Sequence, residues 1–168
     1  MSTTEIWVFG YGSLIWGTGV VKAAERLEGI LPGWHREWTW ISSTRHGAPT
    51  CSLERGGRVK GVFLRLNSET ASQDLGRFRQ RENPATEETM ADLPKPDATS
   101  YFWTMGNNLR RHRELSGLQG DALAKALAER AAGITRAGPN GITAMDYIRR
   151  LHAFDPDDAV TAEITRFL

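Results

Sequence analysis

One carboxylate, Glu82, occupies a position in the sequence where acid–base chemistry could take place. Leu75, Phe78 and Glu82 follow the i, i+3, i+7 spacing of one helical face, and Leu75 and Phe78 are the large apolar residues of that segment. The pattern predicts a helix whose apolar side faces the core, with Glu82 at the inner edge of its last turn. Loss of hydration there would make the carboxylate a stronger base. A solvated carboxylate at a frayed helix end is the alternative.

A second candidate is the stretch VFGYGSLIWG, residues 8–17, in which two glycines flank a tyrosine. Its spacing does not fit the dinucleotide-binding, Walker A or nucleophile-elbow motifs, so Ser13 is not supported as a nucleophile. It fits a strand that ends in an open turn, whose backbone N–H groups could bind a carboxylate or a phosphate. A β-bulge or a hairpin turn is the alternative.

The elements that must position these residues are strands in the first half and helices later. Period-two and β-branched patterns predict strands at 5–9, 29–42, 50–54, 58–66 and 99–105, with a hairpin turn at 54–57. Start and stop signals predict helices at 67–83, 120–133 and 140–154, the last capped by Thr143. This order predicts an α+β fold around a mixed or antiparallel sheet, with closure into a small β-barrel as an option.

Composition restricts the class of protein further. The 168 residues suit a single domain, residues 1–168, and a formal charge of +1 favours neither nucleic acid nor an anionic membrane as a partner. The N-terminus resembles no signal peptide and no apolar run is long enough to span a bilayer, so a cytoplasmic protein is expected. No feature of the sequence specifies an oligomeric state.

The sequence gives little support for a metal site or for an anion site built from its basic residues. The histidines are not spaced as metal ligands, and Cys51, the one cysteine, can form neither an internal disulfide nor a zinc site. The basic residues at 110–113 are expected to form a solvated turn, with capture of a second carboxylate as the alternative. Trp34, Trp38 and Trp40 have the even spacing of one strand face and are expected in the core.

Several of these motifs resemble one family. FGYGSLIW is similar to the N-terminal motif of the γ-glutamylcyclotransferase superfamily, most of all to its ChaC branch, the glutathione-specific enzymes. Arg81 and Glu82 match the pair that carries the family's catalytic glutamate, and AAGITRAGPNGITAMDYIRRL is similar to its late helix. The resemblance extends over roughly residues 5–152.

The resemblance implies a small mixed barrel with flanking helices and the cleavage of a γ-glutamyl amide, glutathione above all, to 5-oxoproline and a free amine. It implies no metal and no cofactor. Glu82 would be the general base and acid, and substrate binding would fall to Tyr11, Gly12, Ser13, Leu14 and Tyr147. For Tyr147 an ordinary core position on its helix is an equal alternative.

The chain departs from the family pattern directly after Glu82. The family has a glycine and a tyrosine within a few residues, whereas this chain reads RENPATEETM. Two alternatives therefore accompany the glutathione-cleaving enzyme. One is a cyclotransferase for γ-glutamyl-amines or γ-glutamyl amino acids, and the other is a non-catalytic module that binds a small carboxylate.

Overall fold

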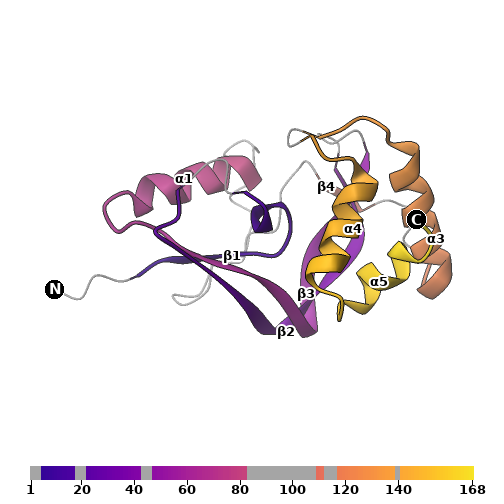
Figure 1. Ribbon diagram of the computed structural model, residues 1–168, viewed down its shortest axis with the longest axis horizontal. Coiled ribbons are helices and arrows are strands. Elements are labelled where there is room, and N and C mark those ends of the chain that lie inside the picture. Colours follow the sequence, from indigo (N-terminus) through magenta and orange to yellow (C-terminus); the bar gives the residue numbers. More distant parts are fainter. Residues whose placement is uncertain (1–4, 18–21, 43–46, 83–108, 112–116, 139–140) are drawn as a thin grey trace. The chain divides into compact units, whose positions relative to one another are not determined.

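Four strands form the sheet of the computed structural model, which describes residues 5–17, 22–42, 47–82, 109–111, 117–138 and 141–168 (Figure 1). They are β1 (Trp7–Gly10), β2 (Glu25–Ser42), β3 (Ala48–Arg65) and β4 (Leu109–Arg111). Their order in the sheet is β1-β3-β2-β4. β1 pairs antiparallel with β3, and β4 pairs antiparallel with β2.

The helices occupy the segments between and after the strands. They are the 3-10 helix η1 (Ser13–Ile15), α1 (Ala71–Glu82), α3 (Gly120–Gly133), α4 (Ala144–Phe154) and α5 (Ala159–Thr165). The predicted α+β class is confirmed, and so are the predicted helices at α1, α3 and α4. In the described part of the chain, no helix is long and apolar enough to cross a membrane.

The sheet differs from the prediction in that it is not closed into a barrel. Within the described ranges, β1 and β4 are the two ends of the strand order. These strands have only 4 and 3 residues, so each offers few backbone groups for the hydrogen-bond ladder that closure requires.

The predicted hairpin turn at 54–57 is wrong, because β3 continues through it. Gly56 and Gly57 adopt positive φ angles of 110° and 68° inside the strand. The Nδ1 atom of His35 on β2 lies 3.1 Å from the carbonyl oxygen of Gly56. A glycine pair that can form a turn can equally form an irregularity within a long strand, and here it does the latter.

Two residues of the basic segment at 110–113 are described by the structure, and both belong to a strand. Arg110 and Arg111 belong to β4, opposite Ile41 and Trp40 of β2. The prediction of a turn is therefore wrong for these two residues, whose side chains lie outside the described part of the chain. The rest of that segment and the predicted strand at 99–105 lie outside the described residues.

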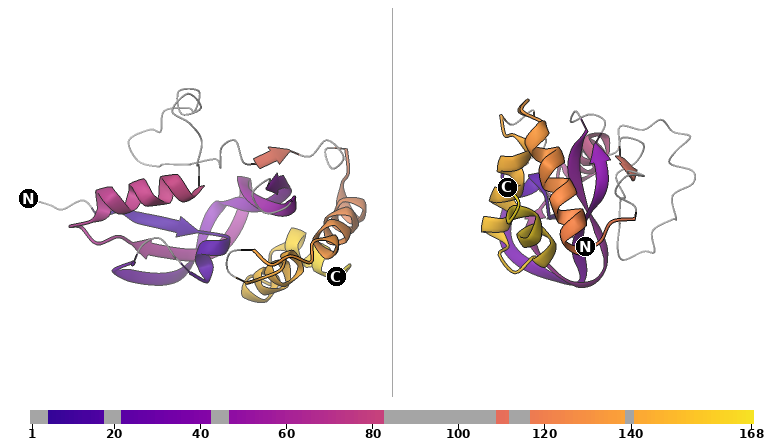
Figure 2. Two further views of the ribbon diagram at one scale, coloured as in Figure 1. Left: turned by 90° about the horizontal axis from the view of Figure 1, so that it is seen from above. Right: turned by 90° about the vertical axis from the view of Figure 1, so that its right-hand side faces the viewer.

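The contacts divide the chain into two compact units. The first comprises residues 1–27 and 62–108, and the second comprises residues 28–61 and 109–168. β2 and β3 contribute residues to both units, and the single domain over 1–168 stays a prediction. In the first unit α1 lies along β1 (Figures 1 and 2), and the buried apolar residues include Leu14, Val62, Leu64 and Phe78.

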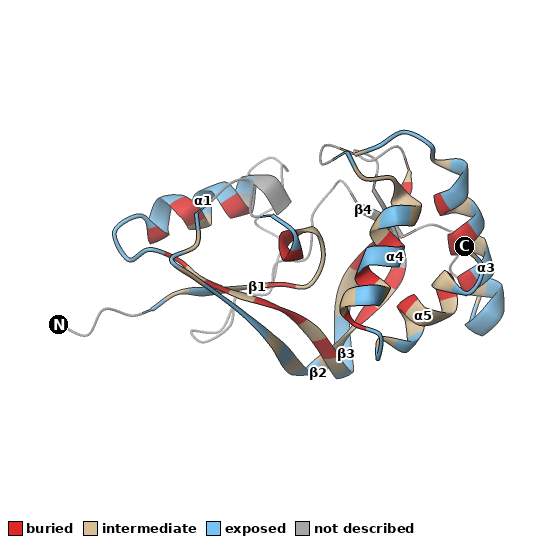
Figure 3. Ribbon diagram, in the orientation of Figure 1, coloured by how far each residue is buried: buried red, intermediate tan, exposed pale blue. Residues whose placement is uncertain are grey.

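In the second unit α3, α4 and α5 pack against one another. α3 buries a stripe of small and apolar side chains at helical spacing, and α4 and α5 contribute further core residues (Figure 3). These buried residues are Ala124, Leu127, Ala128 and Ala131 on α3, Ile148 and Leu151 on α4, and Ile164 on α5. Burial of this apolar surface is the main source of stability for the helical part of the unit.

The helix α4 begins at the predicted cap, and this cap can be tested. Thr143 accepts a hydrogen bond from the backbone N–H of Asp146 at 3.2 Å through its hydroxyl. Thr143→Ala should therefore lower the free energy of unfolding by about 1 kcal/mol in urea denaturation. Thr143→Ser keeps the hydroxyl and should stay close to the wild type. Equal stability of the alanine and serine variants would contradict the assigned cap.

Candidate functional site

The glycine-containing stretch at the N-terminus forms a strand followed at once by a helical turn. β1 ends at Gly10, and η1 starts at Ser13 with Gly12 as its N-cap. The backbone N–H of Ile15 donates to the carbonyl oxygen of Gly12 at 3.0 Å, which closes the first turn. Because N–H groups before that first bond have no carbonyl to reach within the helix, those of Ser13 and Leu14 must find partners outside η1.

Gly10 is required for the turn to fold back on its own strand. A Cβ atom at Gly10 would lie 2.7 Å from the Cβ of Leu14 and 3.1 Å from the Cγ2 of Val62. The first of these separations is shorter than any carbon–carbon contact allows. The first glycine therefore makes room for Leu14, and the guanidinium of Arg26 holds the other end of η1 by donating to the carbonyl oxygen of Ile15 at 3.0 Å.

The helix that carries Glu82 buries the face on which this residue falls. Ala71, Asp74 and Phe78 are buried, and Leu75 is half-buried. Position 82 continues this stripe at helical spacing and is the last residue of α1. The predicted placement of the apolar face is confirmed for Phe78, whereas the side chain of Glu82 lies outside the described part of the chain.

Asp74 is a buried carboxylate on this helix that the sequence reading did not single out. It is only 3% exposed. Its Oδ2 accepts a hydrogen bond from the hydroxyl of Thr70 at 2.7 Å, and its Oδ1 lies 3.2 Å from Arg77. These partners give both carboxylate oxygens of Asp74 a hydrogen bond or an ion pair within the first turn of α1.

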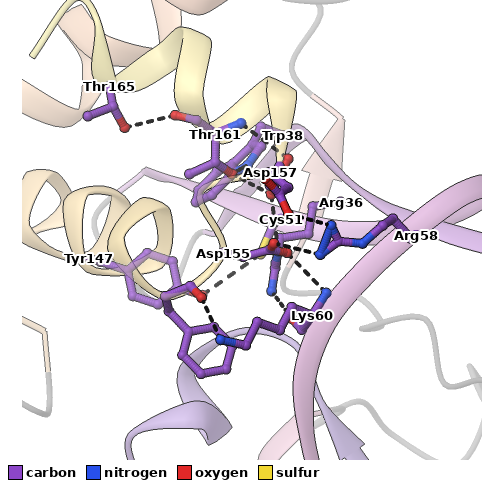
Figure 4. A network of polar contacts seen from close by, with 12 residues as sticks. Arg36, Trp38, Cys51, Arg58, Lys60, Tyr147, Asp155, Asp157, Thr161 and Thr165 are labelled. Atoms are coloured by element: carbon purple, nitrogen blue, oxygen red, sulfur yellow. Dashed lines mark hydrogen bonds and ion pairs between the residues drawn. The ribbon is translucent and has the colours of Figure 1, made fainter. Parts of the chain in front are cut away.

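Tyr147 lies in the second unit, on α4, with its ring and its hydroxyl both in contact with the sheet (Figure 4). The ring meets that of Trp38 edge-on, with the centroids 6.0 Å apart. Its hydroxyl oxygen lies 3.8 Å from the Sγ atom of Cys51 on β3. The side chain as a whole is half-buried, with its ring packed against Trp38 and its hydroxyl against Cys51.

A buried ion-pair network lies next to this tyrosine (Figure 4). Arg36 of β2 is 1% exposed, and its Nη1 lies 2.7 Å from Asp155 and 3.1 Å from Asp158. Asp155 is the C-cap residue of α4, and Asp158 is the N-cap residue of α5. One guanidinium thus joins a strand to the ends of two helices.

Further hydrogen bonds complete the network. Arg36 also donates to the carbonyl oxygen of Lys60, whose own N–H donates to Asp155 at 3.0 Å. Asp158 accepts from the hydroxyl of Thr161 at 2.7 Å, and that hydroxyl accepts from the indole N–H of Trp38 at 3.0 Å. Every charge is therefore matched by an opposite charge or a donor, as buried charges require.

Burial moves the pKa values of Arg36 and of its neighbour Cys51 in opposite directions. Burial lowers the pKa of Arg36, but the electrostatic influence of Cys51 together with the charges and hydrogen bonds of Asp155 and Asp158 outweighs it, so the pKa of Arg36 lies above its ordinary value. Burial raises the pKa of the Cys51 thiol, against the opposing effect of Arg36. The site therefore pairs a charged guanidinium with a neutral thiol at pH 7.

The sequence itself contains a signal for the burial of Arg36, which the predictions above do not include. Arg36 stands midway between Trp34 and Trp38, at the even spacing that places all three on one strand face. A charged residue on the apolar face of a strand must have buried partners. The structure confirms the core position of Trp38, which is fully buried, whereas Trp34 is half-buried and stacks against Arg55.

The predicted site residues fall into both units. Tyr11, Gly12, Ser13 and Leu14 belong to the first unit together with Glu82, and Tyr147 belongs to the second. Leu14 is buried against Gly10, while the other three turn residues are half-buried. Across the ranges that the structure describes, no three His, Cys, Asp or Glu side chains come close enough to hold a metal ion.

The fold and these motifs agree with one known family. Residues 6–156 match the ChaC-like protein family, so the chain belongs to that family. A glutathione-specific γ-glutamylcyclotransferase of Escherichia coli is 37% identical over 82 residues, which are 46% of this chain and 35% of that protein. The match thus spans about a third of the curated relative's length.

A solved structure extends the likeness to the whole fold. The crystal structure of a γ-glutamyl cyclotransferase specific to glutathione from yeast matches with a TM-score of 0.59 at 17% identity. The alignment covers 98% of this chain and 97% of the yeast chain. The resemblance predicted from the sequence is confirmed at the level of family and fold.

The packing at Gly10 leads to a stability prediction. Gly10→Ala should lower the free energy of unfolding by about 1–3 kcal/mol, because the new methyl group overlaps Leu14. Gly76→Ala is the matched control, since Gly76 lies within α1 with nothing near its absent Cβ. That substitution should stabilise the protein by about 0.5–1 kcal/mol. Urea unfolding of both variants measures the difference, and stabilisation by Gly10→Ala would contradict the described turn.

The ion-pair network leads to a second stability prediction. Arg36→Met leaves Asp155 and Asp158 without their buried partner and should cost about 3–5 kcal/mol. Lys125→Met, which removes one member of an exposed pair with Glu129, should change stability by less than about 1 kcal/mol. Thermal and urea unfolding provide the measurement. Similar small effects of the two substitutions would show that the Arg36 network contributes little.

Proposed function

We propose that this protein is a γ-glutamylcyclotransferase that cleaves glutathione to 5-oxoproline and Cys-Gly. The observation that carries the proposal is the ChaC-like family match over residues 6–156. The identity shared with the E. coli enzyme supports glutathione as the substrate, although it covers a part of each chain. Two local features also support the proposal. The turn at residues 11–14 precedes the helix η1, where backbone N–H groups could bind a carboxylate, and the helix α1 ends at the candidate acid–base residue Glu82.

The reaction needs little covalent assistance from the protein. The α-amine of the substrate's glutamyl group attacks its own γ-carbonyl carbon, the amide C–N bond breaks, and the leaving nitrogen takes a proton. Ring closure within one molecule has a large effective concentration once the chain is bent correctly. The protein must therefore bend the glutamyl group, remove a proton from its ammonium and supply one to the leaving amine.

The turn at Tyr11, Gly12, Ser13 and Leu14 would bind the glutamyl α-carboxylate. The N–H groups of Ser13 and Leu14 precede the first hydrogen bond of η1 and are not needed to close it. Neighbouring backbone N–H groups of this kind bind anions well. Gly10 contributes indirectly, since its lack of a side chain lets Leu14 pack closely and fixes the course of the turn.

Glu82 would transfer both protons. It is the last residue of α1, at a position that continues the stripe of Ala71 and Phe78. A single carboxylate can accept a proton from the substrate's ammonium and then donate one to the leaving nitrogen. Tyr147 would contact the substrate through its hydroxyl, since its ring lies edge-on to Trp38 and the residue is only half-buried.

The proposal extends to the setting in which the protein acts. The partner is a small γ-glutamyl compound, and neither nucleic acid nor a membrane is expected. A cytoplasmic location fits a chain whose one cysteine is a free, buried thiol, since reducing compartments keep such thiols unpaired.

Glutathione turnover by the Glu82→Gln variant tests the proposed acid–base role. The amide has nearly the shape of the carboxylate but cannot transfer protons, so formation of 5-oxoproline should fall by about 100-fold or more. Glu69→Gln, an exposed acid ahead of the same helix, should remain as active as the wild type. Mass spectrometry of 5-oxoproline gives the readout, and full activity of Glu82→Gln would contradict the mechanism.

The same assay with γ-glutamyl-alanine discriminates between substrates. Product from glutathione alone would support the proposal, whereas product from γ-glutamyl-alanine alone would keep the mechanism and change the substrate class. No product from either compound with a folded protein would favour the module that only binds a carboxylate. Binding of glutathione without turnover, measured by calorimetry, would then support that module.

A further inference from the structure

The buried thiol of Cys51 has a specific neighbour, the hydroxyl group of Tyr147. Cys51 is 2% exposed on β3, and its Sγ lies 3.8 Å from the Tyr147 oxygen, within reach of a hydrogen bond to sulfur. Figure 4 shows the two side chains meeting from opposite elements, the strand and the helix α4. The contact is therefore part of how α4 is attached to the sheet.

The ring of Tyr147 and the helix that carries it are both held by further contacts. The ring lies edge-on to Trp38, whose indole N–H is itself fixed by Thr161 at 3.0 Å. The end of α4 is held by the ion pair of Asp155 with Arg36 at 2.7 Å. With the ring and the helix fixed, the direction of the hydroxyl group depends on what its oxygen contacts.

We propose that Cys51 is a positioning residue that orients the hydroxyl of Tyr147 toward the substrate. The inference rests on the proposed function, which assigns Tyr147 to the γ-glutamyl substrate. A phenol hydroxyl can donate one hydrogen bond and accept two, so a contact with the thiol is compatible with a second contact to substrate. Sulfur is a weak partner, which makes it suited to orienting the hydroxyl without competing strongly for it.

A thiol suits this position better than its closest replacements. Burial raises the pKa of Cys51, so the side chain stays uncharged and causes no repulsion with the phenol oxygen. Serine has a shorter bond to its oxygen than cysteine has to sulfur, so the gap of 3.8 Å would widen. Alanine removes the contact altogether and leaves a small cavity.

A double-mutant cycle with Cys51→Ala and Tyr147→Phe tests the inference. Cys51→Ala should lower kcat for glutathione by about fivefold with a smaller change in KM, which is the size expected for one hydrogen bond. In the Tyr147→Phe background the same substitution should have no further effect, because the hydroxyl it orients is gone. An equal loss in both backgrounds, or no loss in the wild type, would overturn the proposal.

Two further variants separate positioning from simple loss of packing. Val59→Ala creates a comparable cavity at another fully buried residue of β3 and should lower the melting temperature while leaving kcat near the wild-type value. Cys51→Ser should lose kcat much as Cys51→Ala does, because its shorter side chain leaves the hydroxyl beyond hydrogen-bond distance of Tyr147. A loss of kcat by Val59→Ala as large as that by Cys51→Ala would overturn the proposal.

A measurement that needs no turnover distinguishes this inference from the proposed function. The chain has three tyrosines, and with ¹³C-labelled tyrosine the phenol carbon of Tyr147 is assigned by its disappearance in Tyr147→Phe. Cys51→Ala should shift this NMR signal and its alkaline titration, whereas Val59→Ala should leave both unchanged. An unchanged signal would overturn the positioning role even in an active enzyme. No product from the wild type would overturn the proposed function. The NMR signal of Tyr147 would then still show whether Cys51 contacts its hydroxyl.

Discussion

In the described part of the second unit, one buried cation holds three elements together. Arg36 joins β2 to Asp155 at the end of α4 and to Asp158 at the start of α5. Removing a guanidinium from water is costly, and the cost is offset here by two carboxylates and the carbonyl oxygen of Lys60. The connection between α4 and α5 is therefore held at both ends by the same guanidinium. The position of Tyr147 on the sheet follows from that arrangement and from its contacts with Trp38 and Cys51.

The first unit depends on a steric constraint instead. The turn after β1 can fold back only because residue 10 has no side chain, so that Leu14 packs onto the strand beside Val62. This close packing fixes the course of the backbone through residues 11–14, where the proposed carboxylate site lies. The two units thus hold their proposed substrate-binding groups by different means, through shape in one and through buried charge in the other.

The sequence predicted the elements that have strong local signals. α3 and α4 were predicted from start and stop signals, and Thr143 caps α4 as predicted. The glycine pair at 56–57 was misread, because the same residues serve a turn and a strand irregularity. The position of Arg36 on the apolar strand face of Trp38 is a local signal for a buried charge, but its partners lie 119 and 122 residues away and could not be identified from the sequence. The turn and Glu82 were recognised from residue types and family resemblance, and their roles stay predictions because contact with a substrate is not a local property of sequence.

The most direct test of the central claim is to follow the fate of glutathione in water enriched in heavy oxygen. Attack by the substrate's own amine predicts 5-oxoproline that carries no oxygen from solvent, together with an equal amount of Cys-Gly. Attack by water would instead release glutamate that carries one solvent oxygen. Mass spectrometry distinguishes these products directly. Labelled glutamate, or intact glutathione after incubation with the folded protein, would contradict the account.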